Sequence, residues 1–142
     1  MRLLWQIYMN KRQLGNTNIN LNAIGFGGAP LGDLFENLEE PNCFQVLENC
    51  YEANINLYDT SPLYGYGLSE HRLGNFLKTV DEDSYYLSTK VGRYLTPEQE
   101  SKIDRGRFAG GLNFSPHLDY SYDGVMRSFE QSLIRLAVSK VD

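Results

Sequence analysis

The chain has 142 residues, the length of a single domain with a sizeable hydrophobic core. Its 18 acidic and 13 basic residues give a net charge of −5 and a pI near 5.0, which argues against binding to nucleic acid or to an anionic membrane. No apolar run approaches the roughly 18 residues that a membrane-spanning helix requires.

The beginning of the chain is expected to carry no fold. Residues 1–8 are predicted to be a frayed extension, because Met9 opens a more natural start, and residues 9–142 are predicted to form one folded unit. Cys43 and Cys50 are spaced i and i+7 on an expected helix, as small buried apolar groups. No histidine or further cysteine lies near enough to complete a ligand set, so we expect no metal and a reducing, cytoplasmic setting.

The first half of the chain alternates strand and helix signals. A turn at residues 15–18 joins two short runs, 11–14 and 19–21, into a hairpin, and a buried strand follows at 23–27. Pro41 begins a helix that ends near Asn54, and a strand is expected at 55–59. Ser69 is predicted to cap the next helix, whose buried stripe contains Leu73, Phe76 and Leu77.

The second half continues the alternation after a long interruption. Residues 85–90 are predicted to form a strand, and residues 91–119 a long glycine-rich connection without regular structure. Ser121 is predicted to cap a third helix, and residues 138–142 are predicted to open a further strand. The expected buried face of that helix consists of Val125, Phe129, Leu133 and Leu136.

The order of these elements predicts an α/β fold with a parallel sheet. A (β/α)8 barrel and a doubly wound sheet are the two candidates. The first glycine-rich loop fits neither nucleotide-binding fingerprint: Pro30 stands at the third glycine of G-x-G-x-x-G, and Asp33 stands where a P-loop needs lysine. The barrel, which places its chemistry at the C-terminal ends of its strands, is therefore favoured.

Three polar side chains are expected at strand ends. Asp59 closes one strand, Tyr64 follows in a turn with glycine and proline, and Lys90 closes the next strand. A free tyrosine has a pKa of about 10, and a nearby ammonium favours the phenolate. A carboxylate beside that ammonium keeps it charged. Tyr64 can therefore act as the proton donor, Lys90 can lower the pKa of Tyr64, and Asp59 can hold Lys90 in its charged form. A structural Asp–Lys pair with an ordinary loop tyrosine is the alternative interpretation.

The sequence resembles the aldo-keto reductase superfamily from Met9 to Asp142. The resemblance rests on GFGG at 25–28, YDTSPLYG at 58–65, GLSE at 67–70 with LG at 73–74, STKVGR at 88–93 and SFEQSL at 128–133. Within the superfamily, residues 25–32 and 119–128 look most like bacterial enzymes of the D-threo-aldose 1-dehydrogenase, L-fucose dehydrogenase and pyridoxal 4-dehydrogenase types.

The resemblance implies an NAD(P)-dependent oxidoreductase on a (β/α)8 TIM barrel, using either NAD or NADP. Hydride would pass between the nicotinamide and a carbonyl or alcohol carbon of a sugar or small aldehyde. At the matching positions Tyr64 is the proton donor or acceptor, Lys90 is the residue that lowers the pKa of Tyr64, and Asp59 is the partner of Lys90. Gly28 and Ala29, together with Asp59, are the positions expected to touch the cofactor. Tyr64, Tyr66, Tyr94 and Phe108 are candidates to line a pocket for a sugar or ring face.

The resemblance also implies that the chain is the first half of a barrel: the hairpin, three βα units and the start of strand four. A complete barrel has about 250 residues, and the family's catalytic histidine would follow about five residues beyond Asp142. We therefore expect the 142-residue chain alone to be inactive. The alternative is a truncated or pseudoenzyme chain that at most pairs with another chain, and exposed strand edges predict self-association.

Overall fold

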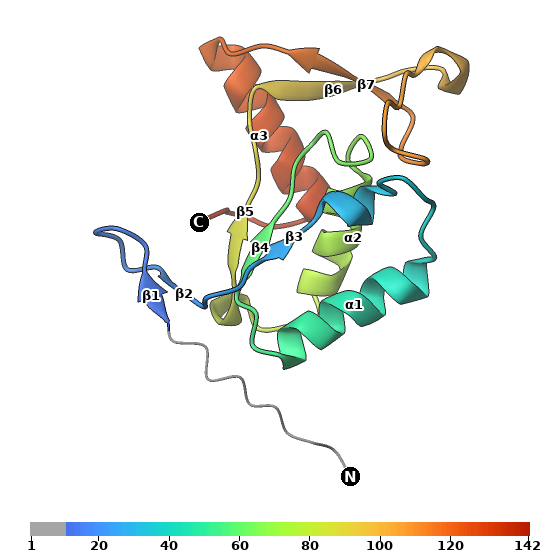
Figure 1. The fold of residues 1–142 in the computed structure, drawn as a ribbon. Coiled ribbons are helices and arrows are strands. Elements are labelled where there is room, and N and C mark those ends of the chain that lie inside the picture. The colour runs from blue at the N-terminus through green and yellow to red at the C-terminus, as the bar shows by residue number, and fades with distance from the viewer. Residues whose placement is uncertain (1–10) are drawn as a thin grey trace.

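The computed structural model describes residues 11–142, so the extension expected for residues 1–8 lies outside the described part. In that part the chain forms a parallel sheet, three α-helices and two antiparallel hairpins (Figure 1). The strands are β1 (Arg12–Gln13), β2 (Asn20–Leu21), β3 (Phe26–Gly27), β4 (Leu57–Asp59), β5 (Tyr86–Ser88), β6 (Arg93–Pro97) and β7 (Phe114–Leu118). The α-helices are α1 (Glu40–Glu52), α2 (Leu68–Leu77) and α3 (Tyr122–Leu136), and the 3-10 turns are η1 (Ala29–Gly32), η2 (Glu82–Ser84) and η3 (Glu100–Lys102).

The sheet has the order β3-β4-β5 with all three strands parallel, which confirms the α/β prediction. Helix α1 connects β3 to β4 and α2 connects β4 to β5, so both crossovers are helical (Figure 1). Tyr58 and Leu87 are buried, and the Tyr58 ring packs on Phe76 of α2 with centroids 6.3 Å apart. Because side chains alternate along a strand, Asp59 and Ser88 lie on the face away from the helices.

The hydrophobic core fills the space between the sheet and its helices. Leu47 of α1 and Leu73 of α2 are fully buried there, and Leu136 closes the core from the end of α3. The predicted stripe of α2 is confirmed, since Leu73, Phe76 and Leu77 are all buried. The core residues are Leu31, Cys43, Leu47, Tyr58, Leu73, Phe76, Leu77, Tyr85, Leu87 and Leu136.

Helix α1 agrees with its prediction. Pro41 lies in its first turn, where the missing N–H costs nothing, and Asn54 follows its C-terminus with a left-handed φ of 61°. Helix α2 differs at its start. Gly67, with φ of 98°, occupies the N-cap position, and Ser69 makes no capping bond. The Ser69 hydroxyl is already used, because it donates to the carbonyl oxygen of Gly28.

Helix α3 begins as predicted, since Ser121 Oγ accepts a hydrogen bond from the N–H of Gly124 at 3.1 Å. Its buried face was predicted correctly at Leu136 and wrongly at the other three positions. The fully covered positions are the i, i+4 series Gly124, Ser128, Ser132 and Leu136, whereas Val125, Phe129 and Leu133 are half-buried. Small side chains occupy the covered face because α3 lies close to α2 and β6, and this contact selects size over hydrophobicity.

The long connection after β5 was also predicted wrongly, because it contains an antiparallel hairpin. Strands β6 and β7 pair from Arg93 opposite Leu118 to Pro97 opposite Phe114. Pro97 and Pro116 made these strands hard to predict, because proline is found in strands mainly at sheet edges. The intervening segment, residues 98–113, is also longer than the turns that identify a hairpin.

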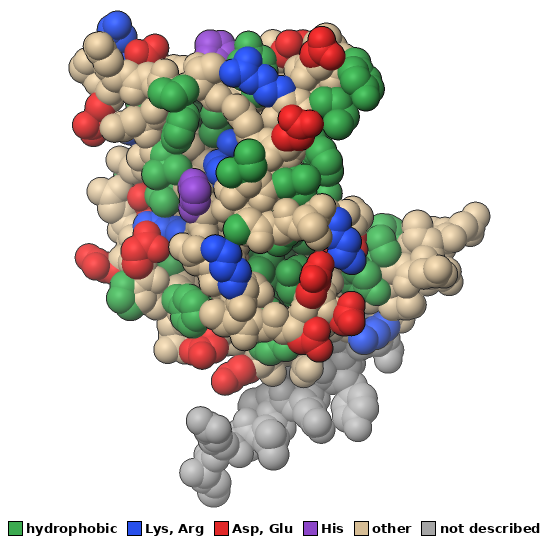
Figure 2. Space-filling view, turned by 180° about the vertical axis from the view of Figure 1, so that it is seen from behind, with side chains coloured by type: hydrophobic (Ala, Val, Ile, Leu, Met, Phe, Trp, Pro, Cys, Tyr) green, Lys and Arg blue, Asp and Glu red, His purple; other side chains and the backbone are tan. Residues whose placement is uncertain are grey.

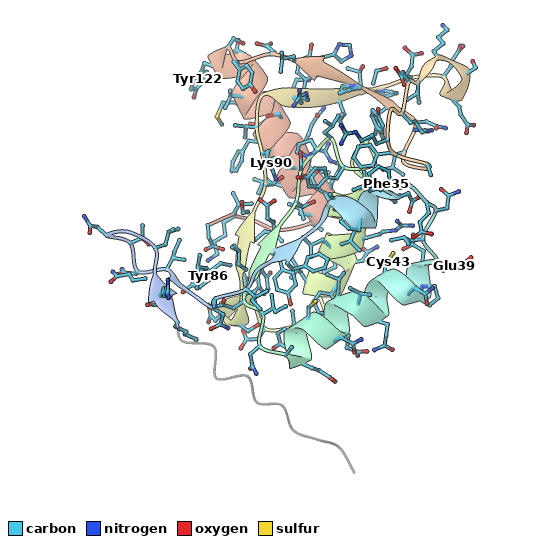
Figure 3. All side chains as sticks on the ribbon, in the orientation of Figure 1. Phe35, Glu39, Cys43, Tyr86, Lys90 and Tyr122 are labelled. Carbon is cyan, nitrogen blue, oxygen red and sulfur yellow. The ribbon has the colours of Figure 1, made fainter. Side chains whose placement is uncertain are left out.

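Further chain segments lie against one end of the sheet and along its β5 edge. At the lower end, the β1–β2 hairpin is confirmed, and Figure 3 places Tyr86 of β5 beside it. The backbone N–H of Asn20 donates to the Tyr86 hydroxyl at 3.3 Å. Residues 138–142 form no strand, but the backbone N–H of Asp142 donates to Leu87 O at 3.0 Å. The chain therefore returns to the edge of β5, where a further strand was expected.

No helix in residues 11–142 is long and apolar enough to cross a membrane. Several large apolar side chains are nevertheless exposed, and on the face that Figure 2 shows, hydrophobic side chains reach the surface between charged ones. The most exposed are Phe35, Leu118, Tyr120, Tyr122 and Ile134.

Gly74 provides a test of the packing between α2 and α3. A glycine inside a helix normally costs about 1 kcal/mol relative to alanine. Here a Cβ would lie 2.7 Å from the Leu136 Cα, against the backbone of α3. We expect Gly74→Ala to lower the free energy of unfolding by about 1–3 kcal/mol in urea denaturation followed by circular dichroism. Asn75→Ala, at an exposed position of the same helix, should lower it less or raise it; equal losses would contradict the close contact.

Candidate active site

Asp59 and Lys90 form an ion pair at the C-terminal edge of the parallel sheet. Lys90 Nζ lies 2.7 Å from Asp59 Oδ2 and also donates to the carbonyl oxygen of Thr60 at 2.9 Å. The other carboxylate oxygen, Asp59 Oδ1, accepts a hydrogen bond from Ser88 Oγ at 2.9 Å. The side chains remain 38% and 47% exposed for Asp59 and Lys90, so the pair is reachable from solvent.

The strand register explains why these residues meet. Asp59 lies directly opposite Ser88 in the β4–β5 pairing, and both side chains point away from the helices. Lys90 follows Ser88 by two residues and therefore continues on the same face. Figure 3 places Lys90 at the upper end of the sheet, below the β6–β7 hairpin.

Tyr64 reaches this pair from the turns between β4 and α2. Its ring lies under the ammonium group, with Lys90 Nζ 4.9 Å from the ring centroid. The turn is held by the Tyr64 N–H, which donates to Ser61 O at 3.1 Å, and by a close approach of two glycines. A Cβ on Gly65, whose φ is 61°, would lie 2.5 Å from Gly32 O, so only glycine lets η1 pack against this turn.

The segment between β6 and β7, residues 98–113, covers the other side of Tyr64. The Phe108 ring packs on Tyr64 with centroids 6.4 Å apart and on Tyr66 with centroids 6.1 Å apart. The segment is attached to the body by main-chain hydrogen bonds: Phe35 N to Arg107 O, Ala109 N to Asp33 O and Leu112 N to Gly65 O, of 2.8–2.9 Å. Tyr64 is thus enclosed between the ammonium of Lys90 and an aromatic wall.

The environment keeps Lys90 protonated. Burial acts to lower the pKa of Lys90, but the side chains of Asp59 and Tyr64 outweigh it, so the Lys90 pKa is raised above 10.5. Lys90 therefore carries its full positive charge at neutral pH. A permanent cation over the Tyr64 ring favours any negative charge that develops on the phenolic oxygen.

Ser69 and Glu70, in the first turn of α2, connect the ends of all three parallel strands. Ser69 Oγ donates to Gly28 O at 2.7 Å, after β3, and accepts from Thr60 Oγ1 at 2.9 Å, after β4. Glu70 Oε1 accepts from Thr89 Oγ1 at 2.8 Å, after β5. These contacts bind the three strand ends to one helix.

Two buried ion pairs lie next to these strand ends. Glu70 is fully buried, and its Oε2 lies 2.6 Å from Arg135 Nε of α3. Arg72 Nη1 lies 2.6 Å from Asp33 Oδ1 and donates to Leu31 O at 2.8 Å, which fixes the end of η1. Buried charges of this kind require a full set of partners, and both arginines have them.

The three positions expected to touch a cofactor differ in availability. Gly28 is buried, its N–H donates to Asp59 O at 2.7 Å and its carbonyl accepts from Ser69. A Cβ there would lie 2.9 Å from both Asp59 O and Ser69 Oγ, so Gly28 serves the packing of the strand ends. Ala29 and Asp59 are partly exposed and border the open edge.

The structure therefore brings Asp59, Tyr64 and Lys90 together, as the sequence predicted. Sequence reasoning missed Ser88 and Thr89, although their positions in the strand before Lys90 carried the signal of alternation. It also missed Glu70 as a partner of Thr89, because a helix residue and a strand end that are 19 positions apart leave no local pattern. Of the aromatic candidates, Tyr94 lies elsewhere and stacks on His117 of β7.

The described residues contain no group of three or more histidine, cysteine or carboxylate side chains that could hold a metal ion. Cys43 and Cys50 are free thiols.

Comparison with known proteins identifies the family. The model of the aldo/keto reductase family matches residues 23–142. The chain belongs to this family. It is 40% identical to pyridoxal 4-dehydrogenase of Microbacterium luteolum, over 93% of this chain and 41% of that protein. It is 39% identical to D-threo-aldose 1-dehydrogenase of a Pseudomonas species, over 84% of this chain and 38% of that protein.

Solved structures agree with this assignment. An aldo-keto reductase from Bacillus halodurans in its holo form superposes with a TM-score of 0.73 at 28% identity, over 95% of this chain and 39% of that one. The chain thus spans about two-fifths of the length of the curated relatives that it matches. The predicted family and the predicted portion of a (β/α)8 barrel are confirmed.

The ion pair can be tested by titration of Lys90. In the Asp59→Asn variant of this aldo/keto reductase chain, burial is no longer offset by the carboxylate, so the Lys90 pKa should fall. Because the folded-state pKa of Lys90 is raised, its contribution to stability is present below pH 10.5 and is lost as the pH rises through the folded-state pKa. NMR of lysine 13Cε and 15Nζ nuclei measures this pKa, with Lys78 as the reference signal. An unchanged Lys90 pKa would mean that Asp59 does not hold it.

Proposed function

We propose that the chain carries the proton-transfer part of an NAD(P)-dependent oxidoreductase that acts on a carbonyl or alcohol carbon of a sugar or small aldehyde. The observation that supports this proposal is the arrangement of Asp59, Lys90 and Tyr64 at one strand edge, with distances of 2.7 Å and 4.9 Å. The family of the chain and the names of its curated relatives support the same reaction class.

In the reducing direction, Tyr64 donates its phenolic proton to the oxygen of the substrate carbonyl while the carbonyl carbon accepts hydride. In the oxidising direction, the same oxygen takes the proton from the alcohol. Lys90 stabilises the phenolate that Tyr64 becomes after donation, and Asp59 keeps Lys90 charged and in place. A bound nicotinamide would supply or accept the hydride. Proton transfer by a positioned side chain typically contributes about 10²–10⁴ in rate.

Ala29 and Asp59 fit a role beside the nicotinamide, since both are partly exposed at the open edge of the sheet. Gly28 contributes indirectly, by letting β3 and β4 approach closely enough to shape that edge. Either NAD or NADP is compatible with these contacts.

The substrate class follows from the wall around Tyr64. Phe108, which is partly exposed, gives an apolar, aromatic surface beside Tyr64 and is backed by the buried ring of Tyr66. A flat pyridine ring or the C–H face of a sugar fits such a surface. We therefore propose pyridoxal-like aldehydes and aldoses as the first compounds to test, and the reducing cytoplasm, which suits the two free thiols, as the location.

The 142-residue chain by itself is proposed to be inactive. Of the three positions expected to touch the cofactor, Ala29 and Asp59 are partly exposed and Gly28 is buried. Hydride transfer requires the nicotinamide to be held close against the carbonyl, a contribution of several kcal/mol. We expect fluorescence titration of the purified chain with NADPH and NADH to show no saturable binding in the micromolar range. Saturable binding with aldehyde-dependent turnover would contradict this expectation. The alternative of a non-catalytic chain makes the same prediction, so a second experiment separates the two.

That experiment is a chimera in which residues 23–142 replace the matching segment of Microbacterium luteolum pyridoxal 4-dehydrogenase, which is 40% identical. We expect the chimera to oxidise pyridoxal with NAD(P), and Tyr64→Phe to reduce kcat by about 10²–10⁴-fold, because the proton donor is lost. Tyr122→Phe, at a side chain that is 79% exposed, is the matched control and should retain the rate.

Two results of the chimera experiment would contradict the proposed function. A folded, cofactor-binding chimera without turnover would favour the non-catalytic alternative. Equal activity of the Tyr64→Phe and Tyr122→Phe chimeras would remove Tyr64 from the mechanism.

A further inference from the structure

Glu70 stands out among the described charged residues because its side chain is fully buried and close to the candidate site. Its two carboxylate oxygens have different partners. Oε2 lies 2.6 Å from Arg135 Nε, so the charge is neutralised by α3. Oε1 accepts a hydrogen bond from Thr89 Oγ1 at 2.8 Å, at the residue before Lys90.

The hydrogen bond between Thr89 and Glu70 is important because of where Thr89 lies in the chain. Strand β5 ends at Ser88, so Thr89 and Lys90 lie beyond the last residue that β4 holds by strand pairing. Side chains alternate along an extended chain, which places Ser88 and Lys90 on one face and Thr89 on the other. Thr89 is therefore held from the helix side while Lys90 points to Asp59. A bond at Thr89 sets the direction in which Lys90 leaves the strand.

We propose that Glu70 is a positioning residue, which keeps the Lys90 ammonium opposite Asp59 and over the Tyr64 ring by holding Thr89. The bond at Thr89 and the ion pair at Arg135 have separable tasks. Arg135 compensates the buried carboxylate, whereas the Thr89 hydroxyl is a neutral donor on an oxygen that is already part of a charged pair. The relevance of this role to catalysis rests on the proposed function.

The test is designed around Thr89, because Glu70→Gln would leave Arg135 buried without a counter-charge and so would change the stability of the fold as well as the bond to Thr89. Thr89→Val keeps the shape of the side chain and removes only the hydroxyl, and Thr89→Ser keeps the hydroxyl. The readout is the Lys90 pKa in the 142-residue chain, measured by lysine 13Cε and 15Nζ NMR, which needs neither cofactor nor turnover. The free energy of unfolding is measured in parallel.

We expect Thr89→Val to lower the Lys90 pKa, since the ammonium loses its fixed place beside Asp59, and Thr89→Ser to retain the wild-type pKa. A purely structural hydrogen bond would reduce the free energy of unfolding and leave the Lys90 pKa unchanged in folded Thr89→Val, which would overturn the proposal. Equal pKa changes in both variants would overturn it as well, because the hydroxyl would then not matter.

The same substitutions in the chimera separate this proposal from the proposed function. We expect Thr89→Val to lower kcat by about 10–100-fold with little change in KM, as for a misplaced catalytic group, and Thr89→Ser to restore the rate. If Tyr64→Phe retains activity while Thr89→Val lowers the Lys90 pKa, the proposed function fails and the positioning role of Glu70 stands. If Tyr64→Phe abolishes activity and the Lys90 pKa does not respond to Thr89→Val, the positioning role fails alone.

Discussion

The structure depends above all on the contact between the first turn of α2 and the ends of the parallel strands. Ser69 binds the chain after β3 and after β4, and Glu70 binds the chain after β5. Strand pairing sets Asp59 opposite Ser88, but the chain segments beyond the strands, one of which carries Lys90, are not held by that pairing. The first turn of α2 binds these segments, at Gly28, Thr60 and Thr89.

Burial of the Glu70 carboxylate is unfavourable by itself, and helix α3 compensates it. A carboxylate that is fully removed from water is unfavourable unless a charged partner and hydrogen bonds compensate it. Arg135 provides the charge from α3, and the small residues Ser128 and Ser132 allow that helix to approach closely. The half-exposed pair of Asp59 and Lys90 thus lies near a second ion pair, Glu70 with Arg135, that is almost completely buried and that solvent and salt screen much less.

Much of the fold and of the candidate site could be predicted from the sequence wherever the signal is local. The hairpin at 11–21, the span of α1, the Ser121 cap and the parallel order follow from turn residues, periodicity and alternation. Asp59 and Lys90 were identifiable because each closes a strand pattern, and Tyr64 because it stands in the turn with glycine and proline that follows Asp59. The buried face of α3 and the β6–β7 hairpin were not, since packing between helices and pairing across residues 98–113 join distant segments. For the same reason no local pattern marked Glu70 as the partner of Thr89.

The attachment of residues 98–113 has a consequence for how such a site can diversify. This segment places Phe108 against Tyr64, yet it is bound to the body through its own backbone groups, at Asp33, Phe35, Gly65 and the Tyr66 hydroxyl. Main-chain hydrogen bonds do not depend on which side chains the segment carries. Substitutions there can reshape the wall beside Tyr64 while the loop keeps its path and the proton-transfer residues keep theirs. Under the proposed function, residues 98–113 shape the substrate side of the site while Asp59, Tyr64 and Lys90 supply the chemistry from other stretches of the chain, so one can change while the other is preserved.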